Sequence, residues 1–328
     1  MRRLLAGVAT GALLLTATAC GSSGDSSTDK GSSSDKGSSA GGVTTVKVGI
    51  IPIVDVAPLY LGQEKGIFKK HGLKLELTPA QGGAAIVPGV VSDQFQFGFS
   101  NMASLMIAQS NGVPVKAVVN GVATTGVKGK DFGALVVKED SGITSAKGLE
   151  GRKVAVNTLK NINDTTVRES VREAGGDPST VRFVEIAFDR MPAALDSGEI
   201  DGAMAVEPAL STAKSQGAKE VSSSYVDVSD KLTVAMYFTS AQYAQQNPKV
   251  VEKFTAATKE ALAYADGHPD EVRDVLTTYT KIPPKLLPEL TLPKWPADAD
   301  RASIETLRDL GEKDELYTKT PDLDALLP

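Results

Sequence analysis

The sequence is poor in the side chains from which proteins build covalent cross-links and transition-metal sites. Its 328 residues include one cysteine, Cys20, and two histidines, His71 and His268. One cysteine excludes a disulfide framework and a cysteine-based zinc site, and two histidines are too few for a site that uses several imidazoles. We expect no metal site and no cofactor, although carboxylates alone are able to hold a hard cation.

Clustered positive charge and long apolar runs are also missing. The formal net charge is −5, and it becomes −7 without Arg2 and Arg3. A mildly acidic chain without a basic patch argues against nucleic acid as a partner. Hydrophobic residues make up 41% and charged residues 23% of the chain, which is typical of a globular protein with a sizeable core. The length allows about two domains of ordinary size.

The first residues resemble an export signal. Arg2 and Arg3 precede an apolar run over residues 4–15, which is shorter than the roughly 20 residues that span a bilayer and therefore predicts a signal-peptide core. The run leads through Ala-Thr-Ala into Cys20, which resembles a lipobox, where the cysteine receives a diacylglycerol after cleavage. Ala17 stands where leucine is usual, and an ordinary signal peptide with an incidental cysteine is the alternative.

A glycine- and serine-rich segment follows Cys20. Fifteen of the twenty-two residues in 21–42 are glycine or serine, so this segment is expected to be a flexible coil with a root-mean-square reach of about 25 Å. Such a tether lets a folded part move above a membrane to which a diacyl chain holds it. We therefore expect a signal peptide over residues 1–19, and a lipidated Cys20 with a linker to residue 42. The protein would be anchored on the extracytoplasmic face of the cell membrane.

From residue 43 short β-branched runs alternate with helical patterns. Strands are predicted over residues 46–51, 73–77, 95–99 and 115–119, and helices over residues 59–68, 84–91 and 103–110. A second set, which starts near Ala134, has strands predicted over residues 153–156, 181–186, 200–206 and 232–238, with helices over 165–174 and 209–216. A further helix carries Pro192 in its first turn, with Asp189 as its expected N-cap.

The chain then turns helical, with helices predicted over residues 249–265, 271–279 and 299–310. Strand–helix alternation implies mostly parallel sheets with helices on both faces. The predicted fold class is α/β, with two lobes and a helical tail that packs on the first lobe.

Five short motifs occur in a characteristic order. They are Val48-Gly49-Ile50 leading to Ala57-Pro58, Glu64-Lys65-Gly66-Ile67-Phe68, Asn111-Gly112-Val113-Pro114, Gly198-Glu199-Ile200-Asp201-Gly202 and Glu207-Pro208. Together, behind a lipoprotein-like signal, they resemble the solute-binding proteins of the nitrate, sulfonate and taurine type, a family that includes pyrimidine-precursor receptors. The resemblance covers residues 43–248 and extends more loosely through the C-terminal helices.

This resemblance implies the type II periplasmic-binding-protein fold, in which two crossing strands join the lobes and the solute is held between them. By analogy the chain leaves lobe one near Leu135 and returns near Tyr237. Lobe one would comprise residues 43–134 and 238–328, and lobe two residues 135–237. A monomeric receptor of this kind closes on its solute and delivers it to an ABC permease and its ATPase.

Candidate binding residues follow from the rule that ligands lie beyond the carboxyl ends of parallel strands. Lobe one supplies Asp55, Gln81, Gly82, Gly83, Ser100 and Asn101. A capping role is the alternative for Asp55 and for the Ser100-Asn101 pair, and a plain tight turn is the alternative for the glycines.

Lobe two supplies Asn157, Thr158, Asn161, Asn163, Asp164, Thr165, Phe188, Asp189, Glu207 and Tyr237. Asx turns and caps account for part of the asparagine-rich loop. The alternative for Phe188 is an ordinary core residue. Tyr237, near the predicted hinge, is expected to stack on the ligand, whereas Trp295 is expected to pack in the tail. Glu207 ends the buried run over residues 203–206, where a charge is costly without a partner. Helix-start electrostatics is the alternative for Glu207.

The candidate segments contain no basic residue; Lys160 and Arg190 only flank them. Anion receptors favour a cationic side chain, commonly arginine, beside the anion. We therefore expect a nitrogen-containing organic solute with N–H donors, such as an amine or an aminopyrimidine, and Glu207 as its main acceptor. A sulfonate or nitrate receptor, which would hold its anion on helix N-termini, is the alternative.

Two other function classes compete with a receptor. The same fold serves a synthase of a thiamin pyrimidine whose family carries a cysteine-rich motif, and a chain with only Cys20 lacks that motif. No serine–histidine–aspartate arrangement or phosphate loop is evident, so no catalytic residue is predicted. A ligand-sensing lipoprotein would share the cleft, and only a neighbouring permease or ATPase gene would separate it from an importer subunit.

Overall fold

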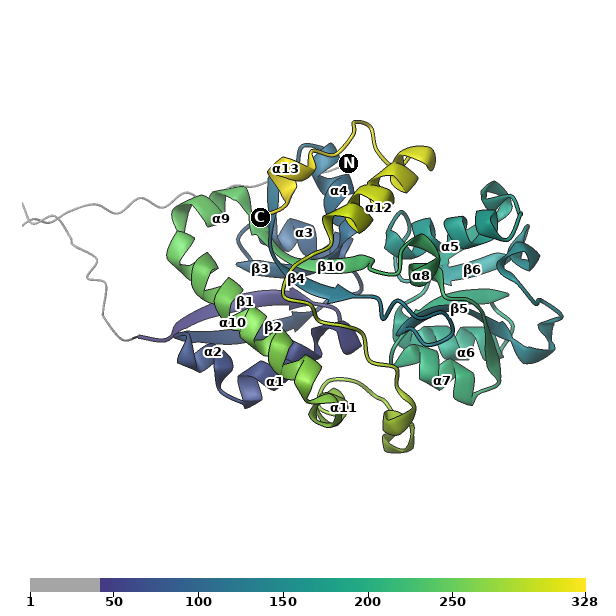
Figure 1. Cartoon of the computed structure of the whole chain (residues 1–328), viewed down its shortest axis with the longest axis horizontal. Coiled ribbons are helices and arrows are strands. Elements are labelled where there is room, and N and C mark those ends of the chain that lie inside the picture. Colours follow the sequence, from purple (N-terminus) through teal and green to yellow (C-terminus); the bar gives the residue numbers. More distant parts are fainter. Residues whose placement is uncertain (1–41) are drawn as a thin grey trace, which may run out of the picture. The chain divides into compact units, whose positions relative to one another are not determined.

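The computed structural model describes residues 42–328. The predicted signal peptide, Cys20 and most of the predicted linker lie outside the described residues. Within the described part, no helix is both long and apolar enough to cross a membrane. Two five-stranded sheets organise this part of the chain (Figure 1).

The first sheet has the strand order β2-β1-β3-β10-β4. Its strands are β1 (Thr44–Ile50), β2 (Leu73–Pro79), β3 (Phe97–Asn101), β4 (Val115–Ala123) and β10 (Thr233–Ser240). Strand β1 runs parallel to β2 and β3, whereas β10 pairs antiparallel with β3 and β4. The carboxyl ends of β1, β2 and β3 therefore lie at one edge of this sheet.

The second sheet has the order β7-β6-β8-β5-β9. Its strands are β5 (Gly133–Lys138), β6 (Lys153–Val156), β7 (Arg182–Glu185), β8 (Gly202–Val206) and β9 (Ala218–Ser222). Strand β6 is parallel to β7 and β8, and β5 is antiparallel to β8 and β9. Each sheet contains one strand, β10 or β5, that runs against the other four, so the expectation of mostly parallel sheets is confirmed.

The chain crosses between the sheets twice, once from β4 to β5 and once from β9 to β10. We call the part built on the first sheet lobe one and the part built on the second sheet lobe two. Leu135 already pairs with Met204 inside the second sheet. Tyr237 lies in the middle of β10, paired with Phe99 and Val119. Both crossings therefore come earlier in the chain than Leu135 and Tyr237, the positions that the family analogy predicts for them.

Helices cover both faces of each sheet (Figure 1). On lobe one, one group packs against one face and another against the opposite face. The first group is α1 (Ala57–Glu64), α2 (Ile67–Lys70), α10 (Pro248–Gly267) and α11 (Pro269–Leu276), and the second is α3 (Gly83–Val91), α4 (Met102–Ser110), α12 (Arg301–Lys313) and α13 (Leu323–Leu326). Helix α9 (Ala241–Gln246) follows β10 directly.

Lobe two is built in the same way. Helices α5 (Ile162–Glu173) and α8 (Ser224–Val228) pack together, as do α6 (Met191–Asp196) and α7 (Ala209–Ser215). Short 3-10 segments join these elements: η1 (Val54–Val56), η2 (Glu139–Ser141), η3 (Ala146–Leu149), η4 (Pro178–Thr180), η5 (Phe188–Arg190) and η6 (Pro284–Glu289).

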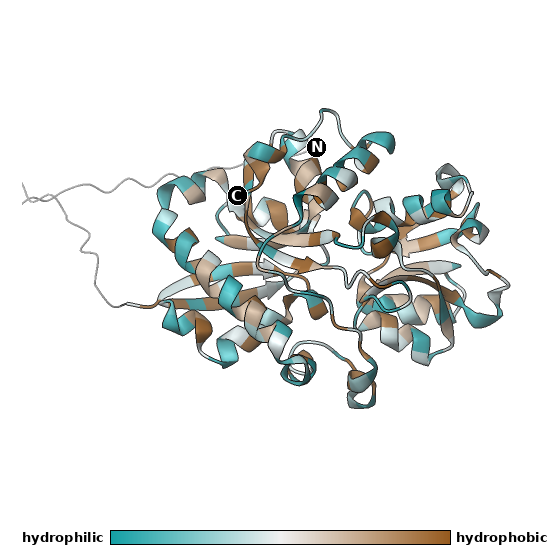
Figure 2. Ribbon diagram, in the orientation of Figure 1, coloured by the Kyte–Doolittle hydropathy of each residue, from teal (hydrophilic) through white to brown (hydrophobic). Residues whose placement is uncertain are grey.

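The central strand of each sheet forms because its residues are buried on both faces of the sheet. In β3 and β8 every residue is buried, and Figure 2 shows hydrophobic colour concentrated along both sheets. Helices α5, α11 and α12 instead carry one apolar stripe each, as expected for helices with one solvent-facing side. On α12 this stripe is Ile304, Leu307 and Leu310.

Three local predictions differ from the structure. The helix predicted over residues 59–68 is two helices, because Gly66 has the left-handed φ of 72° that favours glycine. Arg190, not Asp189, is the N-cap of α6, and no side chain caps that helix, although Pro192 lies in its first turn. Strand β9 was not predicted, because its residues are all half-buried and have no alternation.

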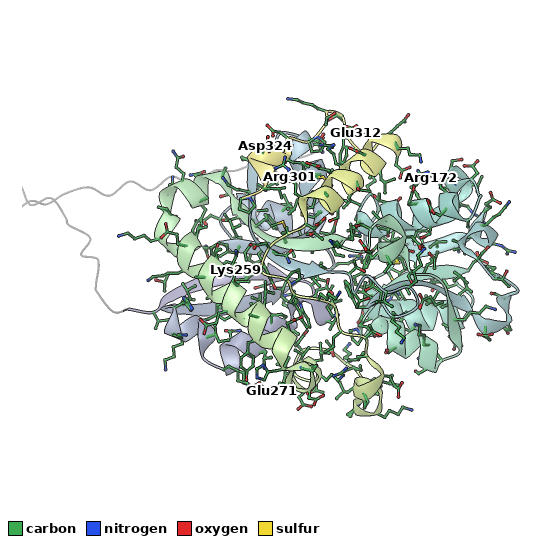
Figure 3. All side chains as sticks on the ribbon, viewed as in Figure 1. Arg172, Lys259, Glu271, Arg301, Glu312 and Asp324 are labelled. Atoms are coloured by element: carbon green, nitrogen blue, oxygen red, sulfur yellow. The ribbon has the colours of Figure 1, made fainter. Side chains whose placement is uncertain are left out.

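Charged side chains cover the outer faces of the helices (Figure 3). Lys259 pairs with Asp298 at 2.7 Å, and Arg301 pairs with Asp324 at 2.7 Å. Such exposed pairs contribute about 0–1 kcal/mol each. Arg172 of α5 also pairs with Asp314, which follows α12, so this ion pair joins the two lobes.

Candidate functional site

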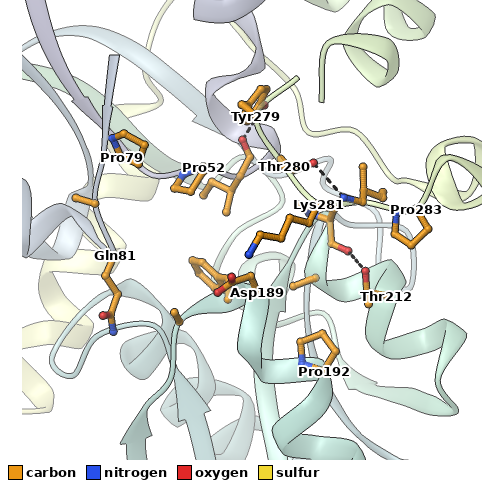
Figure 4. Close-up of a pocket in the computed structure, with 17 residues that line it drawn as sticks. Pro52, Pro79, Gln81, Asp189, Pro192, Thr212, Tyr279, Thr280, Lys281 and Pro283 are labelled. Carbon is orange, nitrogen blue, oxygen red and sulfur yellow. Dashed lines mark hydrogen bonds between the residues drawn. The ribbon is translucent and has the colours of Figure 1, made fainter. Parts of the chain in front are cut away.

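A pocket of about 610 Å³ lies between the two lobes (Figure 4). Lobe one supplies the last residue of β2 and residues that follow β1 and β2: Pro52, Ile53, Pro79, Ala80 and Gln81. Lobe two supplies residues that follow β7 and β8: Ala187, Phe188, Asp189, Pro192, Pro208, Ala209 and Thr212. The pocket therefore lies at strand carboxyl ends, where helix starts and loops meet. Of the predicted residues, Gln81, Phe188 and Asp189 line it directly.

A third wall comes from the C-terminal part of the chain. Tyr279, Thr280, Lys281, Ile282 and Pro283 line the pocket, after α11. Figure 4 shows the Lys281 side chain extending toward Asp189, but no ion pair joins them. The sequence does not predict this segment as part of the site, because no local pattern ties it to strand ends more than 70 residues away.

The lobes meet through reciprocal hydrogen bonds beside the pocket. The side-chain amide of Gln81 donates to the Asn157 carbonyl at 2.9 Å, and that of Asn157 donates to the Gln81 carbonyl at 3.2 Å. The backbone N–H of Val54 donates to the Glu207 carbonyl at 3.1 Å. The structure is thus a closed form, in which loops at the strand ends of both lobes are in contact.

The predicted glycines allow this close approach. A Cβ on Gly82 would lie 2.8 Å from Thr158 Cγ2 and 3.1 Å from Asn157 Nδ2, both in lobe two. A Cβ on Gly83 would overlap Ser100 of lobe one. Gly82 has an extended backbone, with φ −169°, so space between the lobes, and not backbone conformation, favours glycine at this position.

Asn101 has two partners from different lobes. Its side-chain oxygen accepts from the N–H of Ser104 at 2.9 Å and caps α4. It also accepts from the N–H of Ile162, at the start of α5, at 3.3 Å. The capping alternative for Asn101 is therefore present, together with a contact between lobes. The Ser100 hydroxyl is buried and donates to the Asn101 carbonyl at 3.3 Å.

The asparagine-rich loop is largely bonded to itself. The Asn157 side-chain oxygen accepts from Asn161 Nδ2 at 2.7 Å and from Asn163 Nδ2 at 2.9 Å. Asn161 caps α5 through the N–H groups of Asn163 and Asp164, and its Nδ2 also donates to the Thr158 hydroxyl. The capping alternative therefore accounts for much of the polarity in this loop.

The end of the same loop faces two other partners. The Asp164 carboxylate pairs with Arg168 on α5. The Thr165 hydroxyl donates to the Asn161 carbonyl at 3.1 Å. The Asn163 side-chain oxygen accepts from the Tyr225 hydroxyl at 2.7 Å, which connects the loop to the buried aromatic residue of α8.

Glu207 is buried, with 1% of its surface exposed, and both carboxylate oxygens have protein partners. One oxygen accepts from the Ser211 hydroxyl at 2.7 Å and from the N–H of Thr291 at 3.3 Å, and the other accepts from the N–H of Ser211 at 3.0 Å. Burial raises the pKa of Glu207 to about 7, against the lowering effect of these bonds and of Lys214. The carboxylate therefore holds the start of α7 and the C-terminal segment.

Asp55 is also a buried acid, but its carboxyl group is not fully hydrogen-bonded. It is 3% exposed, and its Oδ1 has no hydrogen-bond partner. Burial, with a smaller contribution from the charge of Asp131, raises the pKa of Asp55 to about 7 against the lowering effect of a hydrogen bond from its own backbone. Its backbone is fixed, because Trp295 Nε1 donates to the Asp55 carbonyl at 3.1 Å and the Tyr279 hydroxyl donates to the Ile53 carbonyl at 3.0 Å.

The charge of Asp55 acts on three tyrosines, and the charge of Asp131 acts on Asp55. The charge of Asp55 raises the pKa of Tyr225, Tyr237 and Tyr279, in each case after the larger effect of burial. The Tyr237 ring packs against Phe99 and Phe254, and its buried hydroxyl has no partner. Asp131 accepts from Thr124, Thr125 and Phe132. Among the described residues, no group of three or more metal-ligating side chains forms a metal site.

Comparison with known proteins identifies the family. The model of the family described as NMT1/THI5 like matches residues 53–272, more than half of the chain. The chain belongs to the NMT1/THI5-like family. A taurine-binding periplasmic protein of Escherichia coli strain K12 is 25% identical over 69% of this chain and 68% of its own.

Other relatives differ in name. The 4-amino-5-hydroxymethyl-2-methylpyrimidine phosphate synthase of Aspergillus parasiticus is 25% identical over 65% of this chain and 64% of its own. The alkanesulfonate-binding protein of Xanthomonas axonopodis pv. citri, solved with MOPS, superposes with a TM-score of 0.74. That structure is 14% identical and covers 88% of this chain and 99% of its own. The periplasmic-binding-protein fold expected from the sequence is thereby confirmed.

Proposed function

We propose that this chain is the extracytoplasmic solute-binding receptor of an ABC importer, which captures a small nitrogen-containing organic solute between its lobes. The pocket between two mixed sheets, closed by bonds such as Gln81–Asn157, is the observation that carries this proposal. The names of relatives in the family, among them taurine-binding and alkanesulfonate-binding proteins, support a receptor. The closed form would dock on the permease and release the solute there.

The solute class is supported by the acceptors at the site. Asp55 has a free buried oxygen, and Asp189 lines the pocket. Carboxylates and amides suit a solute with N–H donors, such as an amine or an aminopyrimidine. Affinity near a micromolar corresponds to about −8 kcal/mol, which a few buried hydrogen bonds are able to supply.

An anion receptor is the second candidate, because Lys281 lines the pocket. The predicted segments contain no basic residue, which disfavours an anion. The C-terminal segment, however, supplies the basic side chain of Lys281. A thermal-shift screen of the purified protein against amines, aminopyrimidines, taurine, alkylsulfonates and nitrate separates the candidates. Stabilisation by none of these solutes at millimolar concentration would contradict the receptor function.

Closure of the lobes on the solute is expected to reduce the radius of gyration in small-angle X-ray scattering. Gly82→Val is expected to prevent this change, because a side chain at residue 82 meets Thr158 and Asn157 across the lobe interface. We expect Gly82→Val to weaken binding at least about tenfold, since each lost contact at the interface contributes roughly 1 kcal/mol.

Gly267→Ala is the matched control, because a Cβ at residue 267 meets no atom within 4 Å. This variant should close on the solute as the unchanged protein does. Tight binding without compaction, together with normal binding by Gly82→Val, would refute the clamp. Hydrogen exchange at Leu135 and Tyr237, in the strands that follow the two crossings, gives an independent measure of closure.

Membrane attachment through a diacyl group on Cys20 is part of the same proposal. Cys20→Ala is expected to release the folded protein into the soluble fraction or to block its processing, because the chain then lacks the thiol that receives the lipid. Partitioning into a detergent phase measures the change. A variant that still partitions like the unchanged protein would show that Cys20 is not the anchor.

A further inference from the structure

We call Asp55, Asp131, Tyr225 and Tyr237 the acidic cluster, because all four are buried and their charges act on one another. Asp55 and Tyr237 come from η1 and β10 of lobe one, and Tyr225 comes from α8 of lobe two. Asp131 lies on the crossing between β4 and β5. Pro52 and Ile53 line the pocket, so Asp55 lies two residues along the chain from the cleft wall.

The polar atoms of this cluster are incompletely satisfied. Asp55 Oδ1 and the Tyr237 hydroxyl are both buried without a hydrogen-bond partner. A buried polar atom without a partner is unfavourable, so these two atoms indicate that a further group completes the cluster. Asp131, by contrast, already accepts three hydrogen bonds.

No positive charge balances the two carboxylates. Within residues 42–328, neither Asp55 nor Asp131 takes part in an ion pair with lysine, arginine or histidine. The groups whose charges act on Asp55 and its neighbours are Asp131 and the tyrosines, and none of them is cationic. Two buried carboxylates with one unpaired oxygen fit a single positive charge that also donates hydrogen bonds.

We propose that Asp55, with Asp131 and the Tyr237 hydroxyl, forms a subsite for one cationic nitrogen, so that the solute of this receptor is an organic monocation with N–H groups. This proposal rests on the proposed receptor function and refines its solute class. Asp55 is the acceptor for the cation, whereas Glu207 holds α7 and the C-terminal segment. Because burial holds the pKa of Asp55 near 7, the free protein carries a proton there at acidic pH, and a bound cation displaces it.

Three probes of one shape and different charge test the subsite: benzamidinium, benzamide and benzoate. Trp295, the one tryptophan of the chain, donates to the Asp55 carbonyl, so its fluorescence reports binding, and calorimetry confirms it. At pH 8 we expect benzamidinium to bind and the neutral and anionic probes to bind at least about thirtyfold more weakly, as for a buried charged contact. The affinity of benzamidinium should fall about tenfold per pH unit below pH 6.5, because the cation competes with a proton on Asp55.

Two variants test whether Asp55 and the Tyr237 hydroxyl bind benzamidinium. Asp55→Asn should weaken benzamidinium at least about thirtyfold at pH 8 and remove the pH dependence. Tyr237→Phe, which removes only the unpartnered hydroxyl, should weaken it about fivefold. The exposed Asp140 lies outside the site, and Asp140→Asn is expected to behave like the unchanged protein.

Several results would overturn the subsite. They are equal binding of benzamide or benzoate, no binding of benzamidinium at millimolar concentration, or full affinity in Asp55→Asn. The receptor function is judged separately, by the wider solute screen and by compaction. The wider screen could instead return a neutral or anionic solute that compacts the protein and binds Asp55→Asn as tightly as the unchanged protein. That result would support the receptor function and refute only the cation subsite.

Discussion

The ligand-free protein is expected to lose stability as the pH rises from about 4 to about 7, and Asp55→Asn is expected to remove much of that loss. Asp55 has an ordinary pKa of 3.8 when unfolded and a pKa of about 7 when folded. Below pH 3.8 both states bind the proton and the difference vanishes. Between the two values the folded state holds a proton that the unfolded state has lost, so rising pH favours unfolding.

The expected size of this loss is up to about 4 kcal/mol, from about 1.4 kcal/mol per unit of pKa difference. The titratable groups around Asp55 are Asp131, Tyr225, Tyr237 and Tyr279, and none of them supplies a compensating positive charge. Glu207 adds a loss of the same sign, because burial also raises its pKa to about 7. A residual slope is therefore expected in Asp55→Asn.

Urea unfolding at pH 4.5, 5.5, 6.5 and 7.5 measures this effect. We expect Asp55→Asn to be more stable than the unchanged protein at pH 7.5 and similar at pH 4.5. Asp140→Asn, at an exposed position, controls for the loss of one carboxylate elsewhere. Identical pH profiles for the unchanged protein and Asp55→Asn would show that Asp55 ionises without cost, which would contradict its unpaired burial.

A residue that costs stability but completes a binding site is typical of functional positions. In the free protein Asp55 Oδ1 lacks a hydrogen-bond partner, and a bound cation would supply one. A saturating cation should therefore raise stability most at pH 7.5, where Asp55 is ionised. This coupling links the pH profile of stability to the pH profile of binding.

Local sequence predicted most of the fold, because buried strands here are short β-branched runs between helical patterns. Strand β1 and helix α7 lie within two residues of their predicted ends. Strand direction was not predictable in the same way. Strand β10 is antiparallel to both of its neighbours, and its direction depends on where the chain returns from lobe two, which no residue of β10 encodes by itself.

The strand-end rule placed Gln81, Phe188 and Asp189 in the pocket wall, and Asn157 across from Gln81. It did not find Lys281 or Tyr279, which reach the pocket from the C-terminal segment and follow no strand. The strand-end rule also did not distinguish the role of Asp55 from that of Glu207. Both are buried acids after a strand, and only the tertiary partners, three donors for Glu207 and none for Asp55 Oδ1, distinguish them.

Glu207→Ala is expected to lower the free energy of unfolding by about 3 kcal/mol. It removes the acceptor of the Ser211 hydroxyl and of the N–H groups of Ser211 and Thr291, and each buried donor left unpaired costs about 1–3 kcal/mol. Glu207→Gln retains one acceptor oxygen and the side-chain volume, so its cost should be about 1 kcal/mol. Urea denaturation measures both variants, and Glu289→Ala, at an exposed position of η6, is the control.

The same variant decides which role the carboxylate of Glu207 has. If Glu207 stabilises the fold, Glu207→Ala should also increase hydrogen exchange over residues 284–291, because the Thr291 N–H loses its bond to the Glu207 carboxylate. The sequence alone predicts a different outcome, in which Glu207 is the main acceptor for the solute and Glu207→Ala weakens binding at least about thirtyfold. Unchanged stability together with that loss of affinity would make Glu207 a ligand acceptor. A loss of stability with cation affinity retained would leave Asp55 as the acceptor.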